Sequence, residues 1–393
     1  MRRNGLALVV MLVGLLFIAP MAGCQQDEPA ENPETGTDAE DSTAAGNAGA
    51  YVWIEAEDAE VVQAIKPPEN NPEAAGYTTS GWGKTHLISE GKWLSVNIRD
   101  NQVEGRIPEG GAIFGYYFQI EEAGEQEVWA RLGMEWIRAD FDWRIDEGEW
   151  KRVVSRENPT TDLYEIQRWN ELGWLKLADS NLDAGKHTLQ IRLPVTYQED
   201  RNGNEKPQRV VFIADAFCIS AGSFYPNSKY KPDADWKTEE DLEAAEVVYE
   251  MPAPAGDGKR TELDLGGLWQ YARYDETGWV EDAHGPIQET PDPGTLHWRA
   301  ITVPGNRNAQ YPDMFFNHRY FYRTRVNIPE DYEGKRLLLD VRQKNFIATV
   351  FVNGQRMGWS DTVLCPMRVD ITEAVKPGEK AEEAREEEEE PSV

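Results

Sequence analysis

The sequence is poor in basic residues and in cysteine. It holds 40 Lys and Arg against 70 Asp and Glu, which gives a formal net charge of −30. Nucleic acids and anionic lipid headgroups are bound through basic patches. The balance therefore argues against a nucleic-acid partner and against direct adsorption to a charged membrane, and it leaves a neutral ligand such as a sugar open.

The three cysteines exclude a disulfide framework. Cys24 follows an N-terminal apolar run, and Cys218 and Cys365 lie in different expected domains. Cys218 and Cys365 could pair with one another, but because of this separation we expect both to be free, buried thiols. The sequence also lacks zinc-ligand spacing, a phosphate-binding glycine loop and a nucleophile elbow. No organic cofactor is expected.

Residues 1–23 have the features of a secretion signal. Two arginines follow Met1, and the apolar core at 6–18 is short for a membrane-spanning helix. Met-Ala-Gly-Cys at 21–24 resembles a bacterial lipobox, in which the signal is cut before the cysteine and its sulfur takes a lipid. We expect lipidation of Cys24, and ordinary secretion with a coincidental cysteine is the alternative.

These N-terminal features predict the location of the protein. An exported lipoprotein would be anchored in the outer membrane or at the cell surface or periplasm, and this lipid would be its only membrane contact. Residues 24–50 are acidic and contain no large apolar residue. They are expected to be a disordered tether, because they cannot bury enough surface to fold.

The rest of the chain predicts an all-β protein. Short segments that alternate apolar and polar residues, with glycines between them, are typical of β-sandwiches. We expect two sandwiches in tandem, of the jelly-roll, galactose-binding-like type, at residues 51–223 and 261–378. A proline-punctuated linker at 224–260 would hold an acidic helix within 235–249, and 379–393 would be a charged tail.

The second domain carries the more specific pattern. Its Asn-Gly pair at 353–354 is a strong hairpin signal, because both residues accept positive φ. The expected strands are 320–328, 336–341 and 346–352, and the other motifs are Leu-Gly-Gly-Leu-Trp at 265–269, Val-Pro-Gly at 303–305, Gly358 and Asp-Ile-Thr at 370–372. Taken in this order, they resemble the N-terminal sugar-binding domain of glycoside hydrolase family 2. That jelly roll calls for another strand after 378, where this sequence is almost entirely charged, so we expect the second sandwich to be incomplete at its C-terminal end.

The first domain resembles carbohydrate-binding modules of the family 6 and 35 type. The resemblance is carried by Ile-Glu-Ala-Glu at 54–57, Glu-Val-Trp-Ala-Arg at 127–131, the run at 182–189 and Asp215. In those families the opening Glu pair and the late Asp hold a structural calcium, which implies a site at Glu55, Glu57 and Asp215. Calcium prefers several hard oxygen ligands. The alternative is that these are solvated strand carboxylates.

Aromatic rings on loops are the expected sugar contacts. Tyr77 and Trp82 lie in a loop rich in glycine and serine at 76–83, and Trp136 lies between two strands. In the second domain, Asp361 follows Gly358 and would accept hydrogen bonds from sugar hydroxyls. Core or edge packing is the alternative for each ring, and a solvated turn is the alternative for Asp361.

Catalysis is not expected from this chain alone. The resembled family places two catalytic glutamates on a (β/α)8 barrel, and no alternating strand–helix pattern occurs in the sequence. The leading hypothesis is a surface-anchored carbohydrate-binding lipoprotein that captures oligo- or polysaccharide. One alternative is the front part of a family 2 glycosidase, β-galactosidase- or β-glucuronidase-like, whose barrel is absent from this chain. Another is a scaffold that binds protein.

Overall fold

The structure, a computed structural model, describes most of the chain between Ala50 and Glu379. The described residues are 7–13, 50–68, 71–133, 139–154, 161–168, 170–200, 202–256, 258–273, 286–290, 295–314, 319–344 and 347–379. The expected lipidation at Cys24, the tether apart from Ala50, Trp136 and residues 380–393 of the charged tail lie outside them. No helix within these ranges is long and apolar enough to cross a membrane.

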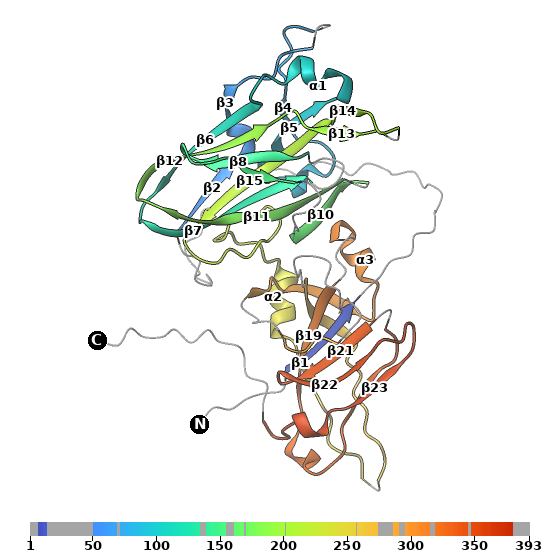
Figure 1. The fold of residues 1–393 in the computed structure, drawn as a ribbon. Coiled ribbons are helices and arrows are strands. Elements are labelled where there is room, and N and C mark those ends of the chain that lie inside the picture. The colour runs from blue at the N-terminus through green and yellow to red at the C-terminus, as the bar shows by residue number, and fades with distance from the viewer. Residues whose placement is uncertain are drawn as a thin grey trace, which may run out of the picture.

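The first domain is a sandwich of two antiparallel sheets (Figure 1). Strands of one sheet are β2 (Tyr51–Glu55), β4 (Thr78–Ser80), β5 (Lys92–Ile98), β7 (Gly124–Gly133), β10 (Thr161–Gln167), β11 (Asn170–Leu182) and β15 (Val210–Ser220). Strands of the other are β3 (Glu60–Gln63), β6 (Ala112–Ile120), β8 (Phe141–Ile145), β9 (Lys151–Val153) and β12 (Gly185–Leu193). The orders are β10-β11-β7-β15-β5-β4, with β2 beside β15, and β3-β6-β12-β8-β9.

Strand β6 shows why this sandwich forms. Phe114, Tyr116 and Phe118 are buried at alternate positions, whereas Tyr117 between them is 67% exposed. The buried rings meet Phe217 of β15 in one large core cluster between the sheets. Full burial of each such ring contributes roughly 1.5–3 kcal/mol. The predicted all-β sandwich is confirmed.

Smaller elements complete the first domain. They are η1 (Ala56–Asp58), η2 (Thr85–Leu87), η3 (Ser89–Gly91), α1 (Asp100–Arg106) and a hairpin of β13 (Tyr197–Glu199) and β14 (Glu205–Pro207).

The second domain packs a large sheet on a small one. The large sheet contains β1 (Ala7–Val13), β16 (Val248–Glu250), β17 (Gly267–Arg273), β18 (Arg299–Val303), β19 (Arg319–Asn327), β21 (Ile347–Val352) and β22 (Gln355–Ser360). Its order is β18-β17-β19-β1-β21-β22, with β16 parallel to β19. The small sheet pairs β20 (Leu338–Val341) with β23 (Met367–Asp370), and one core cluster joins residues of both sheets.

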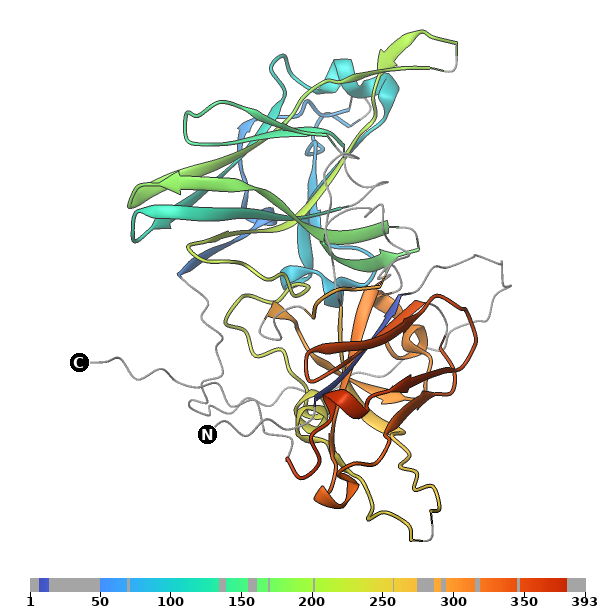
Figure 2. The same ribbon diagram turned by 60° about the horizontal axis from the view of Figure 1, so that its bottom comes forward.

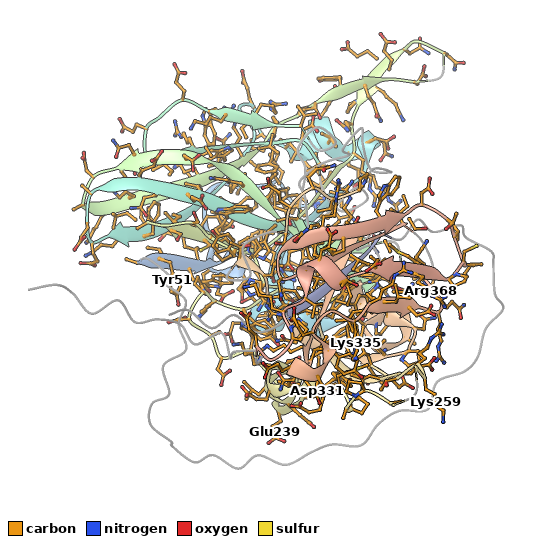
Figure 3. All side chains as sticks on the ribbon, turned by 90° about the horizontal axis from the view of Figure 1, so that it is seen from below. Tyr51, Glu239, Lys259, Asp331, Lys335 and Arg368 are labelled. Carbon is orange, nitrogen blue, oxygen red and sulfur yellow. The ribbon has the colours of Figure 1, made fainter. Side chains whose placement is uncertain are left out.

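Helical turns surround the second sandwich. They are α2 (Glu239–Glu246), α3 (Arg307–Gln310), η6 (Pro312–Met314), η7 (Glu330–Tyr332) and η8 (Thr372–Ala374). Asn353 and Gly354 have φ of 51° and 76° between β21 and β22, so the predicted Asn-Gly hairpin is confirmed. The end of this domain that faces away from the first carries exposed charges of both signs, such as Lys259, Asp331 and Lys335 (Figure 3).

The residues expected to form a linker make contacts with the second domain. Thr238 and Asp241 form a capping box that starts α2, which lies within the acidic helix expected at 235–249. Asp241 Oδ1 also accepts a hydrogen bond from the backbone of Ala300 at 2.6 Å, and β16 extends the large sheet. The part of this segment from Thr238 onward therefore belongs structurally to the second sandwich.

Residues 7–13 of the N-terminal apolar run form β1, in the middle of the large sheet. The sequence favours a signal core here, but a run rich in Val and Leu also has high strand propensity. In Figures 1 and 2 this dark blue strand lies between the orange and red strands of the second domain.

The cysteine predictions have mixed outcomes. Cys218 and Cys365 are both free, as expected. Cys218 is buried, which raises the pKa of its thiol, whereas Cys365 is exposed and its predicted burial is wrong. The physical reason is that Cys365 lies in the exposed loop between β22 and β23, outside the alternating strands.

Candidate carbohydrate-binding site

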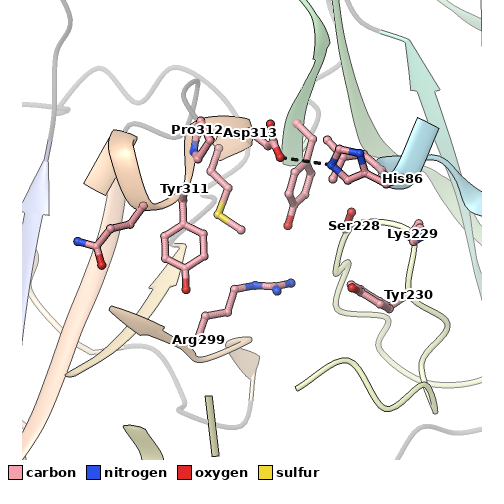
Figure 4. Close-up of a pocket in the computed structure, with 12 residues that line it drawn as sticks. His86, Ser228, Lys229, Tyr230, Arg299, Tyr311, Pro312 and Asp313 are labelled. Atoms are coloured by element: carbon pink, nitrogen blue, oxygen red, sulfur yellow. Dashed lines mark ion pairs between the residues drawn. The ribbon is translucent and has the colours of Figure 1, made fainter. Parts of the chain in front are cut away.

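Two adjoining cavities, the seam pockets, lie where the two sandwiches meet. The first has a volume of about 200 Å³ and the second about 250 Å³, and both are lined by Arg299 and Met314. The first domain contributes η2, β10 and residues 225–230, and the second contributes β17, β18 and residues 310–314. Figure 4 shows Tyr311, Arg299 and Tyr230 around the space of the first pocket.

The first domain reaches into the core of the second at this seam. Tyr164 of β10 is 3% exposed and belongs to the core cluster of the second domain, with Leu87 packed against it. The Arg273 guanidinium lies 4.4 Å over the Tyr164 ring and forms an ion pair with the buried carboxylate of Asp162. An interface with buried apolar and ionic contacts fixes the two domains relative to one another, so the pockets have defined walls.

Residues 225–230 form one wall because the first domain holds them in place. The Ser228 carbonyl accepts a hydrogen bond of 2.8 Å from Trp174 Nε1, and its amide donates to the Asp162 carboxylate. Ser228 has φ of 52°, in the left-handed region that few residues adopt without support. These bonds aim the neighbouring side chains of Lys229 and Tyr230 at the first pocket.

The opposite wall is the segment from α3 to η6. Asn306 caps α3 by accepting a hydrogen bond from the Asn308 amide, and Arg307 Nη1 donates to the Met314 carbonyl at 2.7 Å. Tyr311 donates its hydroxyl to the Ala300 carbonyl and stacks on Tyr271 with ring centroids 5.3 Å apart. Burial raises the pKa of Tyr311 to about 12, so its hydroxyl stays protonated.

The charges of the first pocket centre on Asp313. Lys84 Nζ lies 2.5 Å from one carboxylate oxygen and His86 Nε2 lies 3.6 Å from the other. Asp313 is the only carboxylate among the described residues that line either pocket. Lys229 and Tyr230 form no side-chain hydrogen bond with any described residue, which leaves an ammonium and a phenol as binding groups.

Arg273 and Arg299 line the second pocket, although the chain as a whole is acidic. Asn227 is 4% exposed and its Oδ1 accepts a hydrogen bond from Arg299 at 2.7 Å. Its buried Nδ2 has no hydrogen-bond partner among the described residues. His297 Nε2 lies 2.9 Å from the Tyr225 carbonyl. Burial lowers the pKa of His297 to about 4, with the positive charges of Arg273 and Arg299 acting in the same direction. A ligand oxygen would satisfy the Asn227 donor.

The two loop rings predicted as sugar contacts belong to different clusters. Tyr77 packs edge-on against Phe114, with centroids 5.4 Å apart, at the main core of the first domain. Trp82 packs edge-on against Trp93, at 4.9 Å, in a separate cluster. Both rings are half-buried, and the structure does not bring them together as one platform.

The loop that carries Trp82 nevertheless leads to the seam. Gly83 has φ of 75°, and a Cβ there would lie 2.7 Å from the Ile166 carbonyl of β10, so glycine allows this close approach. The Lys84 amide then donates to the same carbonyl at 2.9 Å. This places the Lys84 and His86 side chains beside Asp313.

Asp361 lies away from the seam pockets. It is exposed in the loop after β22, two residues from Trp359, which is 43% exposed. Neither residue lines either pocket.

The predicted calcium site at Glu55, Glu57 and Asp215 stays a prediction, and one of its three ligands forms a buried ion pair. Asp215 and Arg131 are both fully buried, and their ion pair measures 2.5 Å. The other oxygen of Asp215 accepts from the Ser89 amide at 3.0 Å. Burial raises the pKa of Asp215 to about 7, against the opposing effect of Arg131. No group of three His, Cys, Asp or Glu side chains that could hold a metal occurs among the described residues.

Glu55 and Glu57 fit a hard cation better than Asp215 does. Each has one buried carboxylate oxygen that no hydrogen bond reaches within the described part of the chain. Burial raises the pKa of Glu57, and the neighbouring Glu55 carboxylate adds to that rise. Uncompensated oxygens of this kind suit Ca²⁺, whereas the oxygens of Asp215 are held by Arg131 and Ser89.

Sequence reasoning missed most of the seam. Asn227 and Tyr230 fell in the expected linker, and Tyr311 follows a helical turn with no periodic pattern. Arg131 carried a signal, since it is a charged residue at the end of the apolar Val128–Trp129–Ala130 run, but its partner could not be identified without the pairing of β7 and β15. Asp215 lies at a register shift between these strands, a bulge that turns its side chain toward Arg131.

The solved structures similar to this chain include carbohydrate-binding modules. The CBM35 from Cellvibrio japonicus Abf62 is 9% identical, with a TM-score of 0.26 over 44% of this chain and 95% of that one. A family 35 carbohydrate binding module from Clostridium thermocellum is 14% identical, with a TM-score of 0.25 over 44% and 99%. The Podospora anserina GH26-CBM35 beta-(1,4)-mannanase is 12% identical, with a TM-score of 0.27 over 46% of this chain, and the match spans 29% of the mannanase.

The sequence comparisons give one match. No curated protein matches the chain. The resemblance predicted for the second domain is confirmed in part: residues 300–386 match the family model described as Glycosyl hydrolase 2 galactose-binding domain-like.

Proposed function

We propose that the chain binds carbohydrate and that the first seam pocket is a sugar subsite. The observation that carries this proposal is the lining of that pocket, in which tyrosine rings surround a small space with unused hydrogen-bonding groups. Its second-domain wall belongs to the segment that matches a galactose-binding-like family model. The carbohydrate-binding modules and the mannanase named above also point to carbohydrate as the ligand class, and they do so by their names alone.

The pocket offers both kinds of contact that a sugar needs. The C–H faces of a sugar ring pack on aromatic side chains, and Tyr230 and Tyr311 supply such rings. The hydroxyls need partners at the ring edge, and Lys229 donates while Asp313 accepts. A volume of about 200 Å³ suits one sugar residue of a longer chain, with its neighbours outside the pocket.

The pocket is suited to binding rather than hydrolysis. Glycosidases use two carboxyl groups, about 5–5.5 Å or about 6.5–9.5 Å apart. Among the described lining residues only Asp313 has a carboxylate, and Lys84 and His86 already accompany it. The front part of a family 2 glycosidase is the second candidate function, since the match at 300–386 belongs to a glycosyl hydrolase domain model. A protein-binding scaffold remains the third hypothesis.

The proposal also includes anchoring of the protein at the cell surface. A lipid on Cys24 and a tether at 24–50 would hold the sandwiches away from a membrane, where they would capture oligo- or polysaccharide. Cys24→Ser is then expected to move the protein to the soluble fraction. A variant that stays with membranes, with no acyl mass on the wild type, would contradict the anchor.

A structural calcium is proposed at Glu55 and Glu57, with Asp215 as the ligand that the structure supports least. A cation that binds only the folded state raises the melting temperature by mass action. We expect calcium to raise the melting temperature of the wild type more than that of Glu57→Gln. Equal melting curves with calcium and with chelator would remove the site.

Binding calorimetry tests the sugar subsite. Tyr230→Ala should weaken binding of plant or algal oligosaccharides about tenfold or more, because a half-buried ring contributes roughly 1–3 kcal/mol. Tyr117→Ala is the matched control, since Tyr117 is an exposed tyrosine of β6 that lines neither pocket. Equal affinity in both variants would rule out the pocket. Capture of a protein but no glycan would favour the scaffold.

A further inference from the structure

The side chain of Asn227 is a buried donor in the second seam pocket. It is 4% exposed, and it lines this pocket but not the first. Its Oδ1 accepts a hydrogen bond of 2.7 Å from Arg299 Nη2. A guanidinium can only donate, so this bond fixes which end of the amide is the oxygen. Nδ2 then has no acceptor within the described part of the chain. A buried amino group of this kind costs free energy until an oxygen accepts from it.

Arg299 adds a positive charge that forms no ion pair with a described carboxylate. Its guanidinium donates to the neutral amide of Asn227 and lies 4.9 Å from the centre of the Trp236 ring. The other guanidinium of the pocket, that of Arg273, is paired with the buried carboxylate of Asp162. None of the described residues that line the second pocket is Asp or Glu. The pocket therefore combines a cation and an amide donor with no lining anion to compensate them.

His297 narrows the kind of ligand that fits this pocket. Its Nε2 lies 2.9 Å from the Tyr225 carbonyl, and because a carbonyl only accepts, Nε2 carries the hydrogen. Burial lowers the pKa of His297 to about 4, so the ring is uncharged at neutral pH and Nδ1 is an acceptor. A ligand that carries a hydroxyl beside an anionic oxygen uses this acceptor together with the donors of Asn227 and Arg299.

We propose that the second seam pocket binds the anionic oxygen group of an acidic sugar, either a carboxylate or a sulfate ester. The oxygens of that group accept hydrogen bonds from Asn227 Nδ2 and from Arg299, and a hydroxyl of the same sugar donates to His297. Hydrogen bonds in which one partner is ionised are stronger than those between neutral groups. The inference rests on the proposed function, because the neighbouring sugar residue occupies the first pocket, which shares Arg299 and Met314 with the second.

The distribution of charge gives the ligand a direction. Asp313 lines the first pocket and repels an anion there, whereas the second pocket has no carboxylate among its described lining residues. The formal net charge of −30 also repels an acidic glycan at a distance. A preference for an acidic sugar therefore depends on the buried contacts of Asn227 and Arg299 and not on the surface as a whole.

Asn227→Asp tests the proposal with a small change in side-chain shape. The substitution keeps an oxygen that accepts from Arg299, and it replaces the Nδ2 donor with a carboxylate oxygen that repels an anion. Asn97→Asp is the matched control. Asn97 Oδ1 also accepts from an arginine, Arg209, at 2.9 Å, and Asn97 lines neither pocket. Both variants add the same charge to the chain, so a difference between them reports on the pocket.

Binding calorimetry of the full chain compares uronate oligosaccharides with their methyl esters, and sulfated oligosaccharides with their desulfated forms. The wild type and Asn97→Asp should bind one acidic form about tenfold or more tightly than its neutral counterpart, and Asn227→Asp should lose this preference. The pair of ligands that shows the preference identifies the anionic group as carboxylate or sulfate.

Two results would overturn this inference and leave the proposed function standing. One is equal affinity of the wild type for the acidic and neutral forms, which needs no variant to fold. The other is a preference for the acidic form that survives in Asn227→Asp. Binding of none of these ligands would contradict the proposed sugar subsite as well.

Discussion

The first sandwich takes all of its strands from one continuous stretch, whereas the second needs a strand from the far N-terminus. Every strand of the first lies between Tyr51 and Ser220. In the second, β1 joins β19 to β21 across more than three hundred residues of sequence. The first sandwich is therefore built from one continuous segment, whereas the large sheet of the second includes a strand from residues 7–13.

One ion pair from each domain shows how burial changes the cost of losing a charge. The first encloses the ion pair of Asp215 and Arg131, and both side chains are fully buried. The second keeps the pair of Asp340 and Arg368 on its surface, with side chains 42% and 56% exposed. A buried pair is costly to break, because the remaining charge has no water around it.

The largest expected effect is therefore on the first sandwich. Asp215→Ala leaves the Arg131 guanidinium buried without a carboxylate and should lower the free energy of unfolding by about 3–5 kcal/mol. Asp340→Ala breaks the exposed pair and should cost less than about 1 kcal/mol. Thermal unfolding of both variants checks the difference. Similar losses would show that the Asp215 pair is solvated.

Trp82→Ala tests whether the Trp82 ring belongs to the core or contacts a sugar. Because Trp82 packs on Trp93 at 4.9 Å, its loss should lower the free energy of unfolding by about 1–3 kcal/mol. We expect its sugar affinity to match the wild type. A variant with the melting temperature of the wild type but weaker sugar binding would show that the 76–83 loop contacts the sugar.

Two histidines predict opposite pH responses in the two regions. Hydrogen bonds to Asp146 and to the Asp183 carbonyl raise the pKa of His187 in the first sandwich. That stabilisation is fully present below the unfolded-state pKa of about 6.5 and is lost as pH rises through the folded value. At the seam, the pKa of His297 is lowered to about 4, so the stabilisation there is present above about 6.5 and is lost as pH falls toward 4.

Variants of each histidine separate the two responses. His187→Gln should flatten the decline in stability of the first domain above neutral pH, and His297→Gln should flatten the decline of the seam in acid. Domain-resolved hydrogen exchange between pH 4 and pH 8 measures both. A pH dependence that is unchanged in both variants would contradict the assignment.

The smallest effect concerns the ion pair at the seam. Lys84 and Asp313 side chains are 33% and 26% exposed, so solvent screens their attraction. Lys84→Ala should change the free energy of unfolding by less than about 1 kcal/mol, measured by denaturant titration. A larger loss, or separate unfolding of the two domains, would show that this pair holds the seam together.

The alternation of apolar and polar residues was sufficient to predict many of the strands. The pattern of 113–120 and 320–328 predicts β6 and β19, and Asn-Gly at 353–354 predicts the turn after β21, because these signals are local. The apolar run at 6–18 is different, since the same residues suit a signal core or a strand. In the structure, residues 7–13 form a strand that pairs with β19 and β21.

The candidate site was harder to predict, because its geometry is tertiary. Asn227 and Arg299 come from different domains and meet only when the sandwiches dock. Trp82, predicted as a sugar contact, packs against the ring of Trp93, and no periodic pattern in the sequence links these two positions. For Asp215, the resemblance implied a cation as partner, and the structure adds a buried ion pair with Arg131 that the sequence did not indicate.

The most direct test of the sugar site is a footprint on the intact protein. Hydrogen exchange of the full chain, with and without a saturating oligosaccharide found by calorimetry, reports which amides the ligand protects. The proposed site predicts slower exchange in residues 225–230 and 310–314, with little change at 76–83 or 359–364. Protection confined to either of those two loops, with none at the seam, would contradict it.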